Sequence, residues 1–127
     1  MEATSEERIL SALSHLGLFF YLPGIIVALA IYFYKREQSI FVAQHAKQAA
    51  GFQIMVVIVG AIAGFGGFGL VLGGLILGHA AGVVGVVAFF WLTVLLIALC
   101  AVVGIVRALM GKEFNYPLVG ELINKIV

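Results

Sequence analysis

The sequence contains no aspartate, few charges of either sign, a single cysteine and two prolines. Charged residues make up 10% of the 127-residue chain and hydrophobic residues 64%, whereas soluble domains carry roughly 25% charged residues. A soluble domain of this size could not bury so much apolar surface, because small domains have a high surface-to-volume ratio. We therefore expect an all-α polytopic integral membrane protein, with residues 1–127 forming one membrane domain and the lipid bilayer as its first partner.

These shortages also exclude several kinds of function. A formal net charge of +1 gives no basic surface for nucleic acid, and Cys100 has no second cysteine with which to form a disulfide. The three histidines are far apart in the sequence, and no acidic residue falls inside an apolar run. Convergent nucleophiles, bases or metal ligands, which an enzyme would need, are missing. We expect no catalytic residues, no metal site, no cofactor and no enzymatic activity.

Three apolar runs are long enough to cross a bilayer, which takes about 20 residues of helix. They cover residues 9–34, about 49–77 and 83–110. Pro23 interrupts the first run and predicts a kink there, because proline removes a backbone donor. Tyr34 stands next to Lys35, an order typical of a membrane–water boundary. The spans predict three transmembrane helices, with the glycine-rich segment 64–82 open to either helix or loop.

Two amphipathic segments accompany the spans. Ser39 is a good N-cap, and residues 39–48 predict an interfacial lead-in to the second span; residues 117–127, with Pro117 in the first turn, predict a second interfacial helix. Gln53 is the strongly polar group nearest the membrane interior. At 100° per residue, one stripe of the lead-in helix and its continuation carries five side chains: Phe41, His45, Gln48, Ala49 and Phe52.

Glycines separated by four positions recur in the second span, as in Gly60 with Gly64 and Gly69 with Gly73. Such pairs let helix backbones approach closely, so we expect a helix–helix contact, within the chain or between copies. The run of glycines at residues 64–69 lacks the lysine, serine or threonine and the preceding strand of a nucleotide-binding loop, and we reject that interpretation.

The basic residues indicate an orientation. With three spans, the 35–47 linker and the C-terminal tail share one side, which holds six of the seven basic residues. The positive-inside rule then places the linker and the C-terminus in the cytoplasm and the N-terminus outside. His15 and His79 would lie on the side opposite His45. We also expect His45 or Gln48 to lie near residues 114–117 on the cytoplasmic side.

The block Ser39-x-Phe41-Val42-x-x-His45-Ala46-x-Gln48-Ala49-x-x-Phe52-Gln53 and the ending Gly111-x-x-Phe114-x-Tyr116-Pro117 support a family assignment. The chain resembles a widespread family of small prokaryotic membrane proteins of unknown function, which is similar to the chloroplast import component Tic-twenty. The resemblance implies that the His45 block and the Tyr116–Pro117 turn are defining features. It implies no reaction.

Two functions fit these observations. The first is a non-enzymatic accessory or assembly and translocation component of a membrane protein complex, multi-pass in the cell (plasma) membrane of a prokaryote, whose partners are other membrane proteins or further copies of itself. The alternative is a small homo-oligomeric channel or transporter, in which Gln53 and the glycine face line a path.

Overall fold

A computed structural model describes residues 2–126, and every regular element in this part of the chain is helical. The fold class expected from the sequence, all-α, is confirmed. In chain order the elements are α1 (Ser5–Leu16), the 3-10 helix η1 (Gly17–Phe20), α2 (Leu22–Lys35), α3 (Ile40–Ile76), α4 (Ala80–Leu109) and α5 (Gly120–Ile126).

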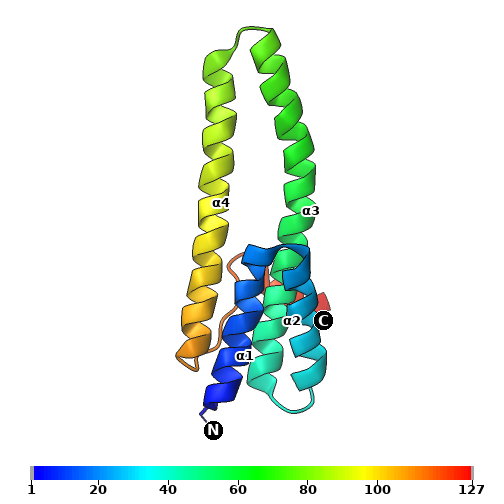
Figure 1. Cartoon of the computed structure of the whole chain (residues 1–127), viewed down its shortest axis with the longest axis vertical. Coiled ribbons are helices and arrows are strands. Elements are labelled where there is room, and N and C mark those ends of the chain that lie inside the picture. Colours follow the sequence, from blue (N-terminus) through cyan, green and yellow to red (C-terminus); the bar gives the residue numbers. More distant parts are fainter. Residues whose placement is uncertain (1, 127) are drawn as a thin grey trace.

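The two longest helices, α3 and α4, form a hairpin that runs the full height of the molecule (Figure 1). Both are long and apolar enough to cross a membrane. At 1.5 Å per residue the 37 residues of α3 extend roughly 55 Å. The glycine-rich segment is helical as far as Ile76, and α4 begins at Ala80. Gly78, with φ +76, makes the turn between them, a backbone conformation that glycine adopts without steric cost.

The expectation of a third spanning helix over residues 9–34 is wrong. Two described helices, not three, are long and apolar enough to span, because the first apolar run reverses direction at residues 17–22. Tyr21 adopts φ 56, and its carbonyl accepts hydrogen bonds from the backbone N–H groups of Gly24 (3.0 Å) and Ile25 (3.3 Å). Pro23 then occupies the first turn of α2, where its missing donor costs nothing. Proline therefore starts a new helix here and does not kink an existing one.

Glycine makes this reversal possible. A Cβ atom on Gly24 would lie 1.7 Å from the carbonyl oxygen of Gly17, so the two arms touch backbone to backbone. The four glycines expected to pack helices behave differently: within 4 Å, a Cβ atom on Gly60, Gly64, Gly69 or Gly73 would meet nothing in the described chain. The intrachain version of that expectation is not supported, and contact between copies stays a prediction.

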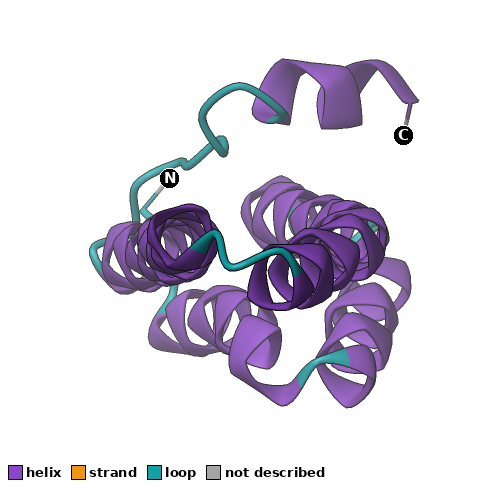
Figure 2. Cartoon of the chain, turned by 90° about the horizontal axis from the view of Figure 1, so that it is seen from above, coloured by secondary structure: helices purple, strands orange, loops and turns teal. Residues whose placement is uncertain are grey.

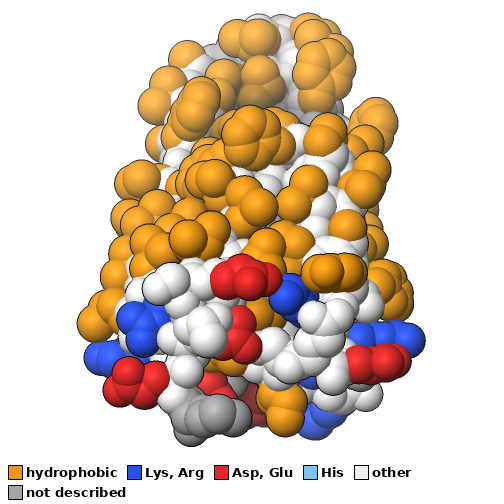
Figure 3. All heavy atoms as spheres, turned by 60° about the horizontal axis from the view of Figure 1, so that its bottom comes forward, with side chains coloured by type: hydrophobic (Ala, Val, Ile, Leu, Met, Phe, Trp, Pro, Cys, Tyr) orange, Lys and Arg blue, Asp and Glu red, His pale blue; other side chains and the backbone are white. Residues whose placement is uncertain are grey.

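The reversal also places the N-terminus at the same end of the molecule as the linker between α2 and α3. Lys35 Nζ and Glu6 Oε1 form an ion pair at 2.8 Å, so the start of α1 lies beside the linker between α2 and α3. Figure 1 shows the N-terminus, this linker and the end of α4 at one end of the molecule, which we call the charged end. The expectation that the N-terminus lies on the side opposite the 35–47 linker is therefore wrong. Figure 3 shows basic and acidic side chains gathered at this end, below an apolar body.

Residues 40–48 form the first turns of α3 and are continuous with the long apolar helix. Ser39 is the N-cap, as the sequence indicates, and its hydroxyl accepts a hydrogen bond from the backbone N–H of Val42 (3.3 Å). Ala28 of α2 packs on Ala49, and Ile31 packs on Val42. Coverage by neighbouring helices, which an isolated sequence pattern does not reveal, buries this segment.

The C-terminal helix is shorter than the expected 117–127 segment. It begins at Gly120, and residue 127 lies outside the described part of the chain. Seen along the long helices in Figure 2, α5 lies side-on at the margin of the bundle. Its Ile123 is buried against Gly51 of α3, where a Cβ atom would approach Ile123 to 2.8 Å. The helix is therefore packed on protein along one face.

Candidate functional site: a buried histidine–tyrosine cluster

Three polar side chains of the 39–53 block point into the protein. His45, Gln48 and Gln53 of α3 are each 2% exposed or less, as is Tyr116 from the segment after α4. His15 of α1 is fully buried beside them. We call these five residues the histidine–tyrosine cluster. Buried polar groups are costly unless hydrogen-bonded, so their partners decide what the cluster does.

Three hydrogen bonds join the two imidazole rings to the chain around them. The Tyr116 hydroxyl lies 2.8 Å from His15 Nδ1, and His15 Nε2 lies 2.9 Å from His45 Nδ1. His45 Nε2 lies 3.0 Å from the carbonyl oxygen of Lys112. The chain of contacts therefore connects α1, α3 and the segment between α4 and α5, which are far apart in the sequence.

The direction of these hydrogen bonds follows from the last acceptor. A carbonyl oxygen only accepts, so His45 Nε2 carries a proton and donates to Lys112. No carboxylate contacts the two rings among the described residues, and because an unpaired buried charge is costly, both imidazoles are neutral. His45 Nδ1 then accepts from His15 Nε2, and His15 Nδ1 accepts from Tyr116. Burial raises the pKa of the Tyr116 hydroxyl, which keeps it protonated as the required donor.

Gln48 uses both ends of its amide. Its nitrogen donates to the carbonyl oxygen of Gly120 (2.9 Å) and to Asn124 Oδ1 (3.0 Å), and its oxygen accepts from the backbone N–H of Tyr116 (3.2 Å). The expected contact between Gln48 and residues 114–117 is therefore present. These bonds hold the turn around Pro117 and the start of α5 against α3.

Aromatic rings close the cluster on the apolar side. The rings of Phe52 and Tyr116 stack at 3.8 Å between centroids, and Phe114 meets Tyr116 edge-on at 4.9 Å. Phe41 packs against the His45 ring at 4.7 Å. Phe41, His45, Gln48, Phe52 and Tyr116, all candidates from the sequence, thus lie together, with Pro117 exposed in the turn beside them. Ser39 lies apart from them, at the N-cap of α3.

Gln53 belongs to the same interior but has a weaker set of contacts. Its nitrogen donates to the carbonyl oxygen of Ser14 in α1 at 2.9 Å, while its oxygen is buried without a hydrogen-bond partner among the described residues. The Ser11 hydroxyl oxygen is buried in the same unpartnered state. Gln53 therefore attaches α3 to α1 and does not line an open path.

His15 is the residue that sequence reasoning placed wrongly. It was expected on the side of the membrane opposite His45, yet the two rings are in direct contact. A Cβ atom on Gly104 would lie 2.9 Å from His15 Nδ1, so α4 leaves space for the ring. The available signal was the spacing of Ser11, Ser14 and His15, which puts three polar groups on one face of an apolar helix.

An ion pair at the charged end joins α1 to the end of α2, where Lys35 Nζ lies 2.8 Å from Glu6 Oε1. The hydrogen bond with Glu6 raises the pKa of Lys35. A hydrogen bond from the Ser39 hydroxyl, more than the backbone N–H of Thr4, lowers the pKa of the exposed Glu7 carboxyl. Thr4 and Glu7 also form a capping box at the start of α1, which satisfies two backbone donors.

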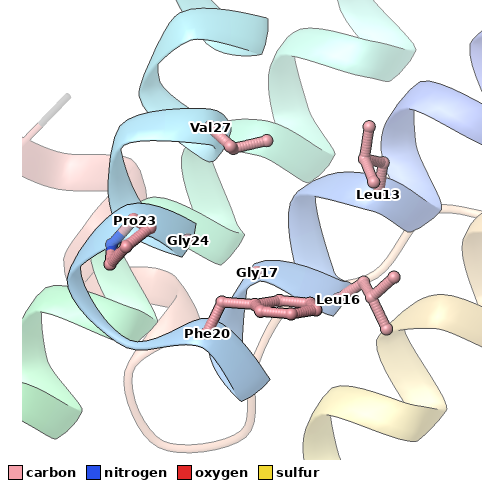
Figure 4. Close-up of a pocket in the computed structure, with 7 residues that line it drawn as sticks. All are labelled: Leu13, Leu16, Gly17, Phe20, Pro23, Gly24 and Val27. Carbon is pink, nitrogen blue, oxygen red and sulfur yellow. The ribbon is translucent and has the colours of Figure 1, made fainter.

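Outside the cluster, an apolar groove of about 290 Å³ lies at the α1–η1–α2 reversal and is shown in Figure 4. It is lined by Leu13, Leu16, Gly17, Phe20, Pro23, Gly24 and Val27. None of these side chains carries a polar group, so the groove offers no chemistry beyond apolar contact.

The cluster has the chemistry of a structural clamp. Within residues 2–126, no three His, Cys, Asp or Glu side chains are grouped so as to hold a metal ion, and Cys100 is a partly buried free thiol packed against the Phe52–Tyr116 rings. Both imidazoles already have a hydrogen-bond partner at each nitrogen. The hydrogen bonds of the two imidazoles therefore join α1, α3 and the segment after α4.

Comparison with protein families matches residues 6–123 to MamF_MmsF, the magnetosome magnetite crystal formation protein family. The match covers α1 to the middle of α5, including every residue of the histidine–tyrosine cluster. The chain belongs to the MamF/MmsF family. No curated protein and no solved structure matches it. The expectation of a small prokaryotic membrane-protein family is confirmed in this form, whereas the similarity to Tic-twenty stays a prediction.

Proposed function

We propose that this MamF/MmsF chain is a non-enzymatic integral membrane component that serves magnetite crystal formation by associating with other membrane proteins through its charged end. The family assignment supports a role in magnetite crystal formation. The long apolar helices α3 and α4 support anchoring in a membrane. The histidine–tyrosine cluster supplies a rigid base, because internal hydrogen bonds join His15, His45, Gln48 and Tyr116 to one another and to the chain around them.

The observation that carries this proposal is the one-sided distribution of charge. No charged residue occurs between Lys47 and Arg107, which includes the whole far half of the α3–α4 hairpin. The turn at that far end offers one imidazole, His79, and no carboxylate. Exposed charged groups able to recognise a partner protein, such as Arg36 and Lys112, are therefore confined to the charged end.

The same distribution supports an orientation. The N-terminus, the 36–39 linker and the segment after α4 share the charged end, which thereby holds all seven basic residues. The positive-inside rule favours the cytoplasm for such an end. We propose that both termini are cytoplasmic and that the turn at residues 77–79 lies on the other side of a prokaryotic membrane that takes part in magnetite formation.

No observation favours the alternative of a homo-oligomeric channel. Gln53, its candidate path-lining group, is 2% exposed and donates to Ser14 inside one copy. Self-association through the open glycine face of α3 is a separate prediction and needs no pore.

The test is recovery of native partners. The chain is extracted from magnetite-forming cells in mild detergent, and co-purifying proteins are identified by mass spectrometry. We expect a defined set of membrane proteins, which is lost in the double variant Arg36→Glu with Lys112→Glu and retained in Phe65→Leu, a matched exposed position on the far half. Recovery of a bare chain in several detergents, or loss of partners only in Phe65→Leu, would contradict the proposal.

A further inference from the structure

The molecule is much broader at one end than at the other. At the charged end α1, α2 and α5 pack around α3 and α4, whereas in the far half α3 and α4 run alone (Figure 1). The helices α1 and α2 have 12 and 14 residues, or roughly 18 and 21 Å at 1.5 Å per residue. Neither can cross a hydrocarbon core of about 30 Å.

The depth of the α1–η1–α2 reversal in the bilayer follows from the residues of α3 that lie at the same level. Leu18 and Val56 both pack against the buried cluster that contains Phe52. Val56 lies nine residues beyond Lys47, the last charge on α3, which corresponds to roughly 13 Å of helix. That distance is about half of a hydrocarbon core. From Val56 to Ile76, α3 continues for roughly another 30 Å, enough to complete the crossing.

The reversal itself has a surface suited to lipid. Phe19, Phe20, Tyr21 and Leu22 are 47%, 63%, 77% and 62% exposed, and none of them is charged. Backbone polar groups at membrane depth must be satisfied by hydrogen bonds within the protein. Here the Tyr21 carbonyl has two backbone partners, and the Gly17–Gly24 contact closes the two arms on each other.

We infer that the α1–η1–α2 hairpin inserts into one leaflet only, so that the protein is a wedge that favours membranes in which the charged-side leaflet is convex. Two extra helices occupy area in that leaflet and none in the other. When the leaflet on the broad side is convex, it has the area that the two helices need. The protein therefore has a higher affinity for the curved bilayer than for a flat one, and this difference concentrates it on curved membranes. The partner is a lipid bilayer of this curvature. The inference rests on the proposed membrane insertion and not on a role in magnetite formation.

The test uses the full chain in giant vesicles of phosphatidylethanolamine and phosphatidylglycerol, from which a narrow tube is pulled. Labelled protein is added in detergent to preformed vesicles, so that the uncharged far end crosses the bilayer and the charged end remains outside; lysine labelling from outside checks this orientation. We expect a several-fold higher density of protein, relative to lipid, on the tube than on the parent vesicle. Equal density on tube and vesicle would overturn the inference.

A variant isolates the hairpin. Phe20→Lys with Leu22→Lys places two charges on exposed positions of the reversal without removing a buried contact, and pulls it toward the headgroups. Ile40→Lys with Leu118→Lys adds the same charge at exposed positions of the charged end. Enrichment on the tube should disappear in the first variant and remain in the second, with helix content by circular dichroism unchanged in both.

Enrichment that survives in Phe20→Lys with Leu22→Lys would show that the hairpin is not its cause. This assay contains only lipid and one protein, whereas partner recovery is measured in native membranes. If the protein is not enriched on the tube but its partners are still recovered, the wedge alone is overturned. If the protein is enriched on the tube but no partners are recovered, the proposed function alone is overturned.

Discussion

The two halves of this protein differ in how many of their side chains are buried by the rest of the chain. At the charged end, buried residues come from α1, α2, α3, α4, α5 and the segment before α5, and they include His15, His45 and Tyr116. Between residues 54 and 100, by contrast, no described residue is buried. Neighbouring protein decides which side chains fit in the first region, whereas in the second no described residue is covered by the rest of the chain. Substitutions of one kind should therefore have opposite consequences in the two halves.

Glycine-to-alanine changes give the largest contrast. Gly24→Ala forces a methyl group against the Gly17 carbonyl and should lower the free energy of unfolding by about 3 kcal/mol, at the upper end for overpacking. Gly64→Ala meets open space and should be neutral or slightly stabilising, because alanine is the better helix former. Thermal unfolding in detergent measures both. Equal effects at the two sites would remove the distinction between the halves.

The hydrogen-bond chain gives the next effect. Tyr116→Phe keeps the ring that stacks on Phe52 but leaves His15 Nδ1 without a donor. An unpaired buried acceptor should cost about 2 kcal/mol. Tyr34→Phe, at an exposed position, is the matched control and should unfold like the wild type. If the two variants cannot be told apart, the Tyr116 hydroxyl does not hold the cluster together.

A smaller effect is expected on the stability of the fold at acid pH. The pKa of Glu7 is lowered in the folded chain, so folding favours the ionised carboxylate. Its contribution to stability is complete above the ordinary pKa of 4.5 and is lost as the pH falls through the lowered value. The midpoint of thermal unfolding should therefore drop in this acid range, and less so in Glu7→Gln. Glu2→Gln is the control and should leave the pH profile unchanged. If Glu7→Gln also leaves it unchanged, the result would argue against the contact of Glu7 with Ser39.

The smallest expected effect is at Ser11. Its hydroxyl oxygen is buried without a partner among the described residues, so Ser11→Ala removes a polar group that gains nothing from folding. The change should be neutral or stabilising, within about 0.5 kcal/mol. Loss of stability beyond that, in the same unfolding measurement, would show that the hydroxyl has a partner.

Apolar length and local signals predict part of this structure. The long helices follow from runs that only a bilayer would accommodate, and Ser39 marks the start of α3 by its capping chemistry. The contact of Gln48 with the segment around Tyr116 was expected because both were assigned to one side of the membrane. Each of these inferences depends on neighbouring positions in the sequence or on a count of charges.

The reversal at Gly17–Leu22 could not be predicted in the same way. A proline inside a long apolar run is compatible with a kinked span, and what decides against it is a backbone contact between Gly17 and Gly24, seven positions apart. The misplacement of His15 follows directly, because one fewer crossing puts α1 back beside α3. Once α1 is there, its polar face has partners that no local pattern in the sequence identifies.

The side of the membrane on which each segment lies tests the central claim most directly. Single cysteines at Thr4, Gln38, His79 and Lys125, in a Cys100→Ala background, are exposed to a membrane-impermeant maleimide in sealed vesicles of one orientation. The structure predicts that Thr4, Gln38 and Lys125 react from the same side and His79 from the other. Reaction of Thr4 together with His79, opposite Gln38, would restore three spans and contradict the reversal, the charged end and the wedge.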